Sequence, residues 1–430
     1  MTEEKKSMVP KLRFPEFTET WEQRKFYDCF KLLRNNSLAR AELAKIGKIR
    51  NIHYGDVLIN YPEVLNISTA TVPFIAESRV NSISKDSYLE NGDIVIADTA
   101  EDESVGKTSE IQGITNHRIV SGLHTIPCRP LVNFSPNFLG FLLNSPSFHD
   151  QLKPLIQGIK VSSISKRALG ETRVYFAKDL DEQAQIGGFF NGLEMLITLH
   201  QRKLDVLNKL KKYLLQKMFP ENGQLIPELR FPAFSGAWEQ RKLSEIVRMN
   251  ARIGWQNLRQ SEFLDDGDFL LITGTDFKNG RVNFGTCHYI AKERFDQDPK
   301  IQVEEGSILL TKDGTIGKVA LVDKLSKPAT LNAGVYNIVP KNRVVESRFL
   351  FQYLSAPFLL DYVNKAATGG TIKHLNQSIL VDFPVSFPSV AEQEKIGKFL
   401  EGIDHVTTLH QRKLEGLRKL KKSLLQQMFV

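Results

Sequence analysis

The chain contains two segments that each occur twice. Residues 10–25, PKLRFPEFTETWEQRK, return as PELRFPAFSGAWEQRK at residues 227–242, with 11 of 16 positions identical. Residues 182–219 return at 392–429, with 23 of 38 positions identical. The copies agree at their edges and differ in the middle. This tandem duplication predicts one scaffold carrying two different contact domains, because a scaffold must fit a common partner while its contact domains need not resemble each other.

The size and composition of the chain favour a folded protein with two domains. Its 430 residues exceed what one core usually serves, whereas two copies of about 200 residues match the usual domain size. No apolar run approaches the roughly 20 residues that span a bilayer, and the three cysteines have neither a disulfide pattern nor zinc-ligand spacing. We therefore expect a cytoplasmic protein without a metal site. The net charge of +8 suits a polyanionic partner, but a solvated basic surface would explain it equally well.

The longer repeat predicts two helices of about 40 residues with a heptad pattern. Asp179 and Ser389 stand three residues before Glu182 and Glu392, as in a capping box. At 1.5 Å per residue each helix would be roughly 60 Å long, so its apolar stripe needs another helix. The predicted coiled-coil core residues at the a and d positions are Ile186, Phe190, Leu193, Ile197, His200, Leu204, Leu207, Leu214, Ile396, Leu400, Ile403, His410, Leu414, Leu417 and Leu424.

Two such helices in one chain pair most easily as an antiparallel coiled coil. The predicted fold class is therefore α+β, with two globular domains of similar fold joined by two long helices that form an antiparallel coiled coil with pseudo-twofold symmetry. The alternative is two amphipathic helices that pack separately, each on its own domain. The predicted boundaries are 1–178 for the first globular domain, 179–220 for the first spacer helix, 221–388 for the second globular domain and 389–430 for the second spacer helix.

Polar residues interrupt the apolar stripe at equivalent places. His200 and His410 occupy d positions near the middle of their helices, where antiparallel packing would bring them together. A neutral hydrogen-bonded pair is favoured over a metal site, which needs three or four ligands. Lys211 and Lys421 occupy a positions, where a lysine either sets the register or packs its stem and extends its ammonium group to solvent. These residues are assigned no chemistry.

The middles of the two copies, residues 26–178 and 243–388, have mixed strand and helix signals that correspond faintly but in register. Residues 92–96 and 306–310 both predict a turn that enters a buried strand. In each copy a predicted helix follows further along the chain. The two middles are therefore expected to share a fold and to differ in their contact residues.

Catalytic motifs are missing from the sequence. The loops 97–107 and 311–318 each end in Gly-Lys, but Glu101 and Val319 stand where a Walker A motif needs glycine and Ser or Thr. There is no Asn/Asp-Pro-Pro-aromatic loop of an amino methyltransferase, no Pro-Asp nuclease motif, and no Rossmann, HExxH or GxSxG motif. An enzyme in its own right is not predicted. Both loops remain plausible contact surfaces, with solvated turns as the alternative.

The duplicated layout resembles the specificity subunit of type I restriction-modification systems. The resemblance rests on tandem copies ending in TLHQRKL…KKxLLQ(K/Q)MF, each after a variable domain that starts near LRFPxF…WEQRK, and it spans the whole chain. Residues 251–258 (ARIGWQNL) and 271–277 (LITGTDF) look like one recurrent type of target-recognition domain. Residues 37–43 (SLARAEL) and 52–58 (IHYGDVL) resemble another type.

The resemblance implies a non-catalytic DNA-recognition subunit. In this family each recognition domain reads one half of a split, asymmetric site in double-stranded DNA, and the helices set the distance between the halves. It further implies two methyltransferase (modification) subunits, which carry S-adenosylmethionine and methylate adenine N6, and restriction subunits, which translocate and cleave DNA with ATP and Mg. No cofactor is expected in this chain. The rival classes are a standalone methyltransferase or nuclease and a two-headed coiled-coil adaptor that binds only proteins.

Polar residues of the loops are the candidate DNA contacts. Arg and Lys suit guanine edges and phosphates, Gln suits adenine, and Ser or Thr can bond to either. About half of the candidates are expected to be structural, with Trp255 as a core or hinge anchor. The candidates in the first domain are Arg40, His53, Tyr54, Lys107, Lys160, Ser162 and Ser163, and those in the second are Arg252, Trp255, Gln256, Lys312, Thr315, Lys318, Thr371, Lys373 and His374.

Overall fold

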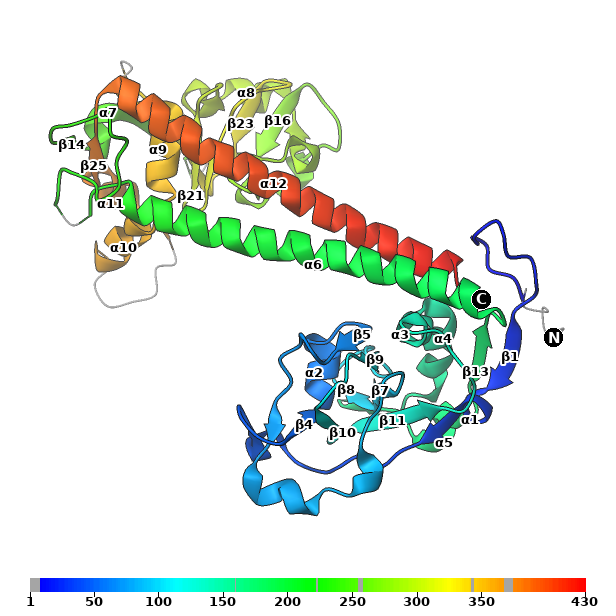
Figure 1. Ribbon diagram of the computed structural model, residues 1–430. Coiled ribbons are helices and arrows are strands. Elements are labelled where there is room, and N and C mark those ends of the chain that lie inside the picture. The colour runs from blue at the N-terminus through cyan, green and yellow to red at the C-terminus, as the bar shows by residue number, and fades with distance from the viewer. Residues whose placement is uncertain (1–7, 159, 222, 254–257, 342–343, 367–373) are drawn as a thin grey trace. The chain divides into compact units, whose positions relative to one another are not determined.

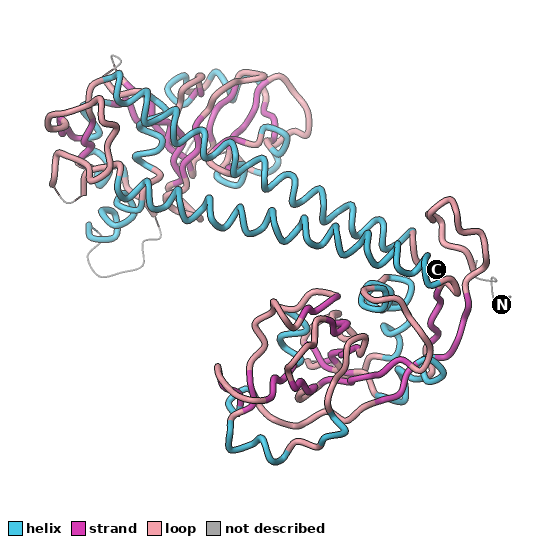
Figure 2. Tube along the Cα trace, viewed as in Figure 1, coloured by secondary structure: helices cyan, strands magenta, loops and turns pink. Residues whose placement is uncertain are grey.

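The computed structural model describes residues 8–158, 160–221, 223–253, 258–341, 344–366 and 374–430. The chain divides into two compact units, here called unit 1 (residues 1–199 and 414–430) and unit 2 (residues 200–413). Two helices of 38 residues each, α6 (Leu180–Lys217) and α12 (Val390–Gln427), contribute one half to each unit (Figures 1 and 2). Both units are mixed α and β, as predicted from the sequence.

Unit 1 is built on a five-stranded sheet of order β2-β11-β7-β9-β5 and a four-stranded sheet of order β10-β4-β6-β3. Two short pairs, β1-β13 and β8-β12, complete its described strands. The strands are β1 (Glu22–Lys25), β2 (Phe30–Leu32), β3 (Leu43–Ala44), β4 (Ile49–Ile52), β5 (Val64–Asn66), β6 (Phe74–Ile75), β7 (Ile94–Ala97), β8 (Thr99–Ala100), β9 (Thr108–Gln112), β10 (Arg118–Ser121), β11 (Thr125–Pro130), β12 (Ser162–Ser163) and β13 (Arg173–Phe176). Its short helices are α1 (Phe26–Cys29), α2 (Tyr54–Ile59), α3 (Phe138–Asn144), α4 (Pro146–Leu152) and α5 (Lys166–Gly170).

Unit 2 has a six-stranded sheet of order β15-β24-β21-β22-β18-β17, a four-stranded sheet of order β19-β16-β23-β20 and the pair β14-β25. Its described strands are β14 (Glu239–Lys242), β15 (Val247–Ala251), β16 (Phe269–Ile272), β17 (Phe277–Lys278), β18 (Arg281–Val282), β19 (His288–Ile290), β20 (Gln302–Val303), β21 (Ile308–Thr311), β22 (Val319–Leu321), β23 (Ala329–Leu331), β24 (Val335–Pro340) and β25 (Pro384–Phe387). Its short helices are α7 (Leu243–Ile246), α8 (Lys292–Asp296), α9 (Ser347–Leu354), α10 (Pro357–Ala366) and α11 (Gln377–Val381).

The faint correspondence between the two middles is confirmed by the strands that it predicts. Strands β7 and β21 are fully buried and follow Gly92 and Gly306, whose φ angles of 89° and 88° favour glycine. In both units one strand of the smaller sheet is parallel to its neighbour, β10 to β4 and β23 to β16. The same framework therefore carries two different sets of loops.

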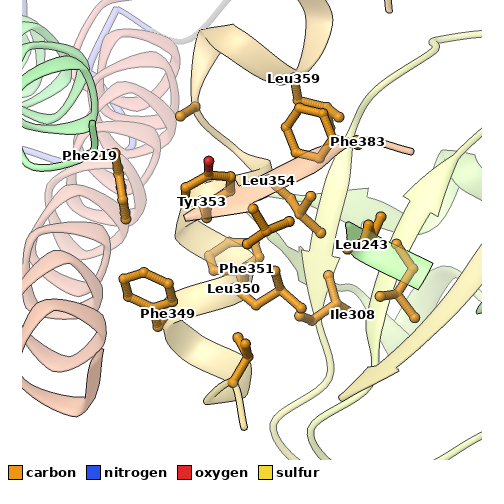
Figure 3. Close-up of a cluster of buried hydrophobic side chains, with 14 of the residues drawn as sticks. Phe219, Leu243, Ile308, Phe349, Leu350, Phe351, Tyr353, Leu354, Leu359 and Phe383 are labelled. Atoms are coloured by element: carbon orange, nitrogen blue, oxygen red, sulfur yellow. The ribbon is translucent and has the colours of Figure 1, made fainter. Parts of the chain in front are cut away.

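In each unit, the repeated segments form a strand pair and a buried contact at the ends of the long helices. Strand β1, with sequence EQRK, pairs antiparallel with β13, the last strand before α6, and β14, also EQRK, pairs with β25 before α12. The end of α12 enters the core of unit 1, where the Phe429 ring lies 6.1 Å from the Trp21 ring. The end of α6 enters the core of unit 2, where Phe219 lies 6.3 Å from Trp238 and joins the buried cluster shown in Figure 3. Each helix thus starts in one unit and ends in the other.

An arginine of the first repeat anchors the start of each long helix. Arg13 donates to both carboxylate oxygens of Glu182 at 2.6 and 2.8 Å, and Arg230 donates to both oxygens of Glu392 at 2.7 Å. The predicted capping box is therefore only partly formed, because these glutamates bind arginine and do not accept from the N-cap backbone amide. The N-cap half is present in α6, where the Asp179 carboxylate accepts from the amides of residues 181 and 182.

The two long helices pack against each other in antiparallel register within each unit. In unit 2 the Nδ1 atoms of His200 and His410 are 2.8 Å apart, and Lys211 forms an ion pair with Asp404. In unit 1 the helix contact is an ion pair between Lys421 and Glu194. Such pairs contradict the alternative of two helices packed separately. All 15 predicted a and d core residues are buried or half-buried.

The lysines at the a positions have more specific roles than the sequence indicated. Lys421 lies 2.6 Å from Glu194 of α6 and 2.7 Å from Glu63 of the globular domain of unit 1. Burial lowers its pKa, but the two carboxylates outweigh that effect and leave the pKa raised. In unit 2 the equivalent cluster contains Lys211, Asp404 and Gln352, whose amide donates to Asp404 at 2.8 Å. Both lysines therefore couple the two helices where a globular domain docks.

Candidate nucleic-acid interface

In unit 1, three segments converge at the end of strand β7. The amide of Asp98 donates to the carbonyl of His124, in the turn between β10 and β11, at 3.1 Å. The amide of Ile164, just after β12, donates to the carbonyl of Asp98 at 2.9 Å. Strand β4 ends beside them, since the amide of Gly122 donates to the carbonyl of Ile52 at 2.8 Å. We call this loop cluster the reading end of unit 1.

Polar side chains gather at this reading end. The Thr99 hydroxyl donates to an Asp98 carboxylate oxygen at 2.8 Å and lies 3.4 Å from Nδ1 of His124, which is 3.6 Å from the same carboxylate. The side chain of His124 is 47% exposed, and its φ of 55° is unusual for a residue other than glycine. Strained, exposed polar residues of this kind are common at binding sites. The group presents both an acceptor and a donor to solvent.

Three predicted contact residues belong to helix α2 or contact it, and Tyr54 links that helix to this group. The Tyr54 ring lies edge-on to His124 at 5.2 Å, so it belongs to the reading end. His53 is only 7% exposed, and its Nδ1 accepts from the Gly55 amide as the N-cap of α2. Burial, with help from Arg40, lowers the pKa of His53 and favours the neutral ring. Arg40 is bound to Asp56 at 2.9 Å but remains more than half exposed.

The other candidates of unit 1 separate into two groups. Ser162 and Ser163 form β12 and lie opposite Ala100 and Thr99, which places them at the reading end. Lys160 is exposed in the loop before them. Lys107 is directed elsewhere: its ammonium group donates to the carbonyl of Leu58 at 2.8 Å, and burial lowers its pKa. The structure therefore gives Lys107 an internal bond instead of a free position on the contact surface.

Unit 2 builds its reading end with the same backbone bonds. The amide of Lys312, just after β21, donates to the carbonyl of Gly334 at 2.9 Å, and the amide of Leu375 donates to the carbonyl of Lys312 at 2.8 Å. The amide of Asn332 donates to the carbonyl of Ile272 at 3.0 Å. These bonds make Lys312 the structural equivalent of Asp98, and Gly334 that of His124. The framework is retained while the side-chain charge changes from negative to positive.

Four predicted candidates of unit 2 lie together in this cluster. The ammonium group of Lys312 is 5.5 Å from the Tyr336 ring centre, and Nδ1 of His374 contacts the Asp313 carboxylate. Thr315 and Lys318 are exposed on the tight loop that follows, which the hydroxyl of Thr311 holds closed by accepting from the Lys318 amide at 2.9 Å. The loop therefore exposes Thr315 and Lys318, while Lys312 and His374 lie at its start.

Arg252 is buried, contrary to its selection as a surface contact. It is 1% exposed, its Nε donates to the carbonyl of Leu331 at 2.8 Å, and burial lowers its pKa. A guanidinium in this position supports the end of β23 and is not available to a ligand. The candidates Trp255, Gln256, Thr371 and Lys373 lie outside the described residues.

The sequence predictions missed Asp98, Thr99, His124 and Asp313 as individual residues. Asp98, Thr99 and Asp313 lie in the two polar loops already considered as contact surfaces, but they had no motif to single them out. His124 had no motif to single it out either. Its position beside Asp98 depends on strand pairing between segments that are distant in the sequence.

The two long helices have a second apolar stripe on their outer surface. Besides the a and d core, their c and g positions hold ten large apolar side chains that are 41–63% exposed. A stripe of this kind fits additional helices that pack beside the coiled coil. The residues are Phe189, Leu196, Leu199 and Leu420 in unit 1 and Val206, Leu210, Tyr213, Phe399, Val406 and Leu409 in unit 2.

Within the described part of the chain, no group of three or more His, Cys, Asp or Glu residues is arranged to hold a metal ion. No helix among the described residues is both long and apolar enough to cross a membrane.

The sequence matches a known family across much of its second half. Residues 236–419 match the family model described as the type I restriction modification DNA specificity domain. A putative type I restriction enzyme MjaX specificity subunit of Methanocaldococcus jannaschii is 23% identical over an alignment that covers 98% of this chain and 95% of the relative. The family model and this relative both indicate a specificity subunit of a type I restriction-modification system.

The solved structures agree with this assignment at the level of the fold. The S subunit of a type I restriction-modification system from M. genitalium aligns with a TM-score of 0.65 at 15% identity, covering 98% of this chain and 99% of that one. The EcoBI specificity subunit of Escherichia coli is 25% identical over 44% of this chain. As a specificity subunit, the chain recognises DNA sequence.

Proposed function

We propose that this specificity subunit reads a split, asymmetric site in double-stranded DNA, with one reading end for each half. The observation that carries the proposal is the exchange of Asp98 for Lys312 at equivalent places of one backbone framework. A carboxylate accepts from the amino group of cytosine, whereas an ammonium group donates to O6 and N7 of guanine. Two readers with opposite charge at this place select different half-sites.

The chain contributes recognition and no catalysis in this proposal. Chemistry belongs to two methyltransferase subunits that carry S-adenosylmethionine and methylate adenine N6, and to restriction subunits that use ATP and Mg to translocate and cleave DNA. The exposed c/g stripe supports the docking of the methyltransferase subunits, because it contains four pairs of apolar residues at the repeat offset of 210. A surface that occurs twice suits two copies of one partner.

A binding experiment with single substitutions tests the proposal. The complex of the full chain with its modification subunit is titrated with labelled duplexes at about 0.15 M salt. Asp98→Asn should lower discrimination at one half-site only and Lys312→Gln at the other only, each by about 10- to 100-fold for one base pair. Asp28→Asn and Lys324→Gln are the matched controls, because both residues are exposed and lie outside the loops that form the reading ends.

The same titration also distinguishes DNA recognition from the rival function of a protein-binding adaptor. A two-headed adaptor that binds only proteins would assemble with its partner, yet the assembly would bind all duplexes equally weakly. Loss of discrimination at both half-sites from one substitution would contradict the assignment of one reading end to each half.

A further inference from the structure

The C-terminal half of each long helix concentrates the positive charge of the chain. Residues 200–217 of α6 and 410–427 of α12 each contain six basic residues and one acidic residue, a formal charge of +5. Together they exceed the net charge of +8 of the whole chain, so the remaining 394 residues sum to −2. The first half of α6, residues 180–199, has three acidic residues and no basic one. The basic character of this protein is therefore a property of two helix segments.

Most of these basic side chains have no role in holding the fold together. Lys211, Lys217 and Lys421 form ion pairs. Eight others are exposed and form no ion pair or hydrogen bond with the residues that the structure describes. They are equivalent pairs at the repeat offset of 210, namely Arg202 and Arg412, Lys203 and Lys413, Lys209 and Lys419, and Lys212 and Lys422.

The heptad positions place six of these eight basic residues away from the apolar stripe, whereas Lys203 and Lys413 occupy g positions within it. Arg202 and Lys209 are at f positions and Lys212 is at b, as are their equivalents in α12, whereas the apolar stripe occupies c and g. In unit 2 the globular domain also contacts α12 from the b and e side, where Arg281 donates to Glu401 at 2.9 Å and Asn279 to Gln411 at 2.7 Å. In an antiparallel pair the b and e edges of both helices share one side. The b and e side thus carries both signs, with Lys212 and Lys422 near Asp205 and Glu415, whereas the outer f face of the two segments is basic and the c and g side is mainly apolar.

We propose that these two basic segments bind the phosphate backbone of the duplex between the two half-sites. The inference rests on the proposed function, since it needs a spacer between two readers. Phosphate contacts fix the position of a protein on DNA without reading its sequence. A role in positioning agrees with the sequence, because the basic residues are the same in both copies whereas the reading ends differ. The segments would supply affinity and alignment, while the reading ends supply the choice of bases.

A charge-neutralising variant tests this inference. Arg202, Lys209, Lys212 and their equivalents Arg412, Lys419 and Lys422 are replaced by glutamine, which preserves helix propensity and removes six charges. The control exchanges Arg for Lys and Lys for Arg at the same six positions, which preserves charge. Binding of the complex with its modification subunit to cognate duplex is measured between about 50 and 200 mM salt.

The expected result is a shallower salt dependence. The slope of log K against log salt should decrease by roughly 0.9 for each phosphate that is no longer bound, about 2 to 5 in all. The ratio of cognate to random DNA affinity should remain unchanged, and the Arg/Lys exchange should bind like the natural chain. A duplex with methylphosphonate linkages only in the spacer should weaken binding of the natural chain and leave the glutamine variant unaffected.

Two outcomes would overturn the inference. An unchanged salt slope in the glutamine variant, with circular dichroism and elution volume preserved, would exclude spacer contacts. Loss of assembly with the modification subunit instead of loss of DNA affinity would mean that the basic segments bind an acidic protein surface. In either case cognate discrimination by the natural chain would leave the proposed function standing, whereas absence of discrimination in the natural chain would contradict that function itself.

Discussion

At the scale of single residues, the repeated arginine gives the first repeat a structural role at the start of each long helix. Arg13 and Glu182 form two hydrogen bonds in a site where the glutamate is 1% exposed, and the Trp21 indole donates to the same carboxylate at 3.2 Å. Removal of the arginine would leave a buried carboxylate unpaired, which is more costly than losing an exposed ion pair.

We therefore expect Arg13→Leu to lower the free energy of unfolding by about 3 kcal/mol. The matched control is Arg24→Leu, because Arg24 pairs with Glu22 at 2.8 Å while both side chains are about one third exposed. That control should cost less than about 1 kcal/mol. Urea unfolding of each variant measures the difference, and equal losses would show that burial of the Arg13 pair does not matter.

Residue-level chemistry was the least predictable part of the molecule. Both Arg252 and Lys312 are cationic residues in polar surroundings in the sequence, yet one is buried beneath β23 and the other lies at the reading end. The local sequence cannot distinguish the two, because the burial of Arg252 depends on contacts such as its hydrogen bond to Leu331, which is 79 positions away. The reading ends became visible only through backbone bonds between distant segments.

At the scale of elements, the long helices and their histidine pair were predictable, whereas the partners of their a-position lysines were not. A sustained heptad determines which positions are buried, so the core and the antiparallel pairing followed from the sequence. The heptad also identified the a-position lysines but could not name Glu63, which comes from a globular domain, as a partner of Lys421. The coupling between helix and domain is a tertiary feature without a periodic signal.

Lys421 therefore provides an element-scale prediction. Lys421→Met should lower the free energy of unfolding by about 2 kcal/mol, because it leaves two partly buried carboxylates without a cation. Lys419→Met, on the exposed surface of the same helix, should change it by less than about 0.5 kcal/mol. Denaturation followed by circular dichroism at 222 nm would compare them, and similar losses would contradict a special role for Lys421.

The histidine pair makes the coiled coil sensitive to acid. Burial and the neighbouring His410 lower the pKa of His200, so the unfolded chain binds a proton at a higher pH than the folded chain. The stability supplied by the neutral pair is thus complete above the unfolded pKa of about 6.5 and is lost as the pH falls below it.

Replacement of both His200 and His410 by leucine should reduce the loss of stability between pH 7.5 and 5.5. His405→Gln is the control, because His405 is exposed on the same helix. Midpoints of urea unfolding at both pH values measure the effect. If the double variant lost as much stability on acidification as the control, the pair would not be responsible for the pH dependence.

At the scale of the whole molecule, the duplication separates what is constant from what varies. The anchoring arginines, the helix pair and the exposed c/g stripe recur in both copies, while the reading ends keep their backbone bonds and change their side chains. The two-domain layout with a helical connection followed from the sequence because it depends on repeats and periodicity. Which bases are read does not follow, since contact residues alone give no code.

The central claim is that two unlike readers on one frame select two unlike halves of a DNA site. The most direct measurement maps N6-methyladenine across a genome that carries this gene and its modification partner, and across the same genome after deletion of the gene. We predict a split, asymmetric motif with one methylated adenine in each half, present only with the gene. A continuous palindrome, or no N6-methyladenine that depends on the gene, would contradict the account.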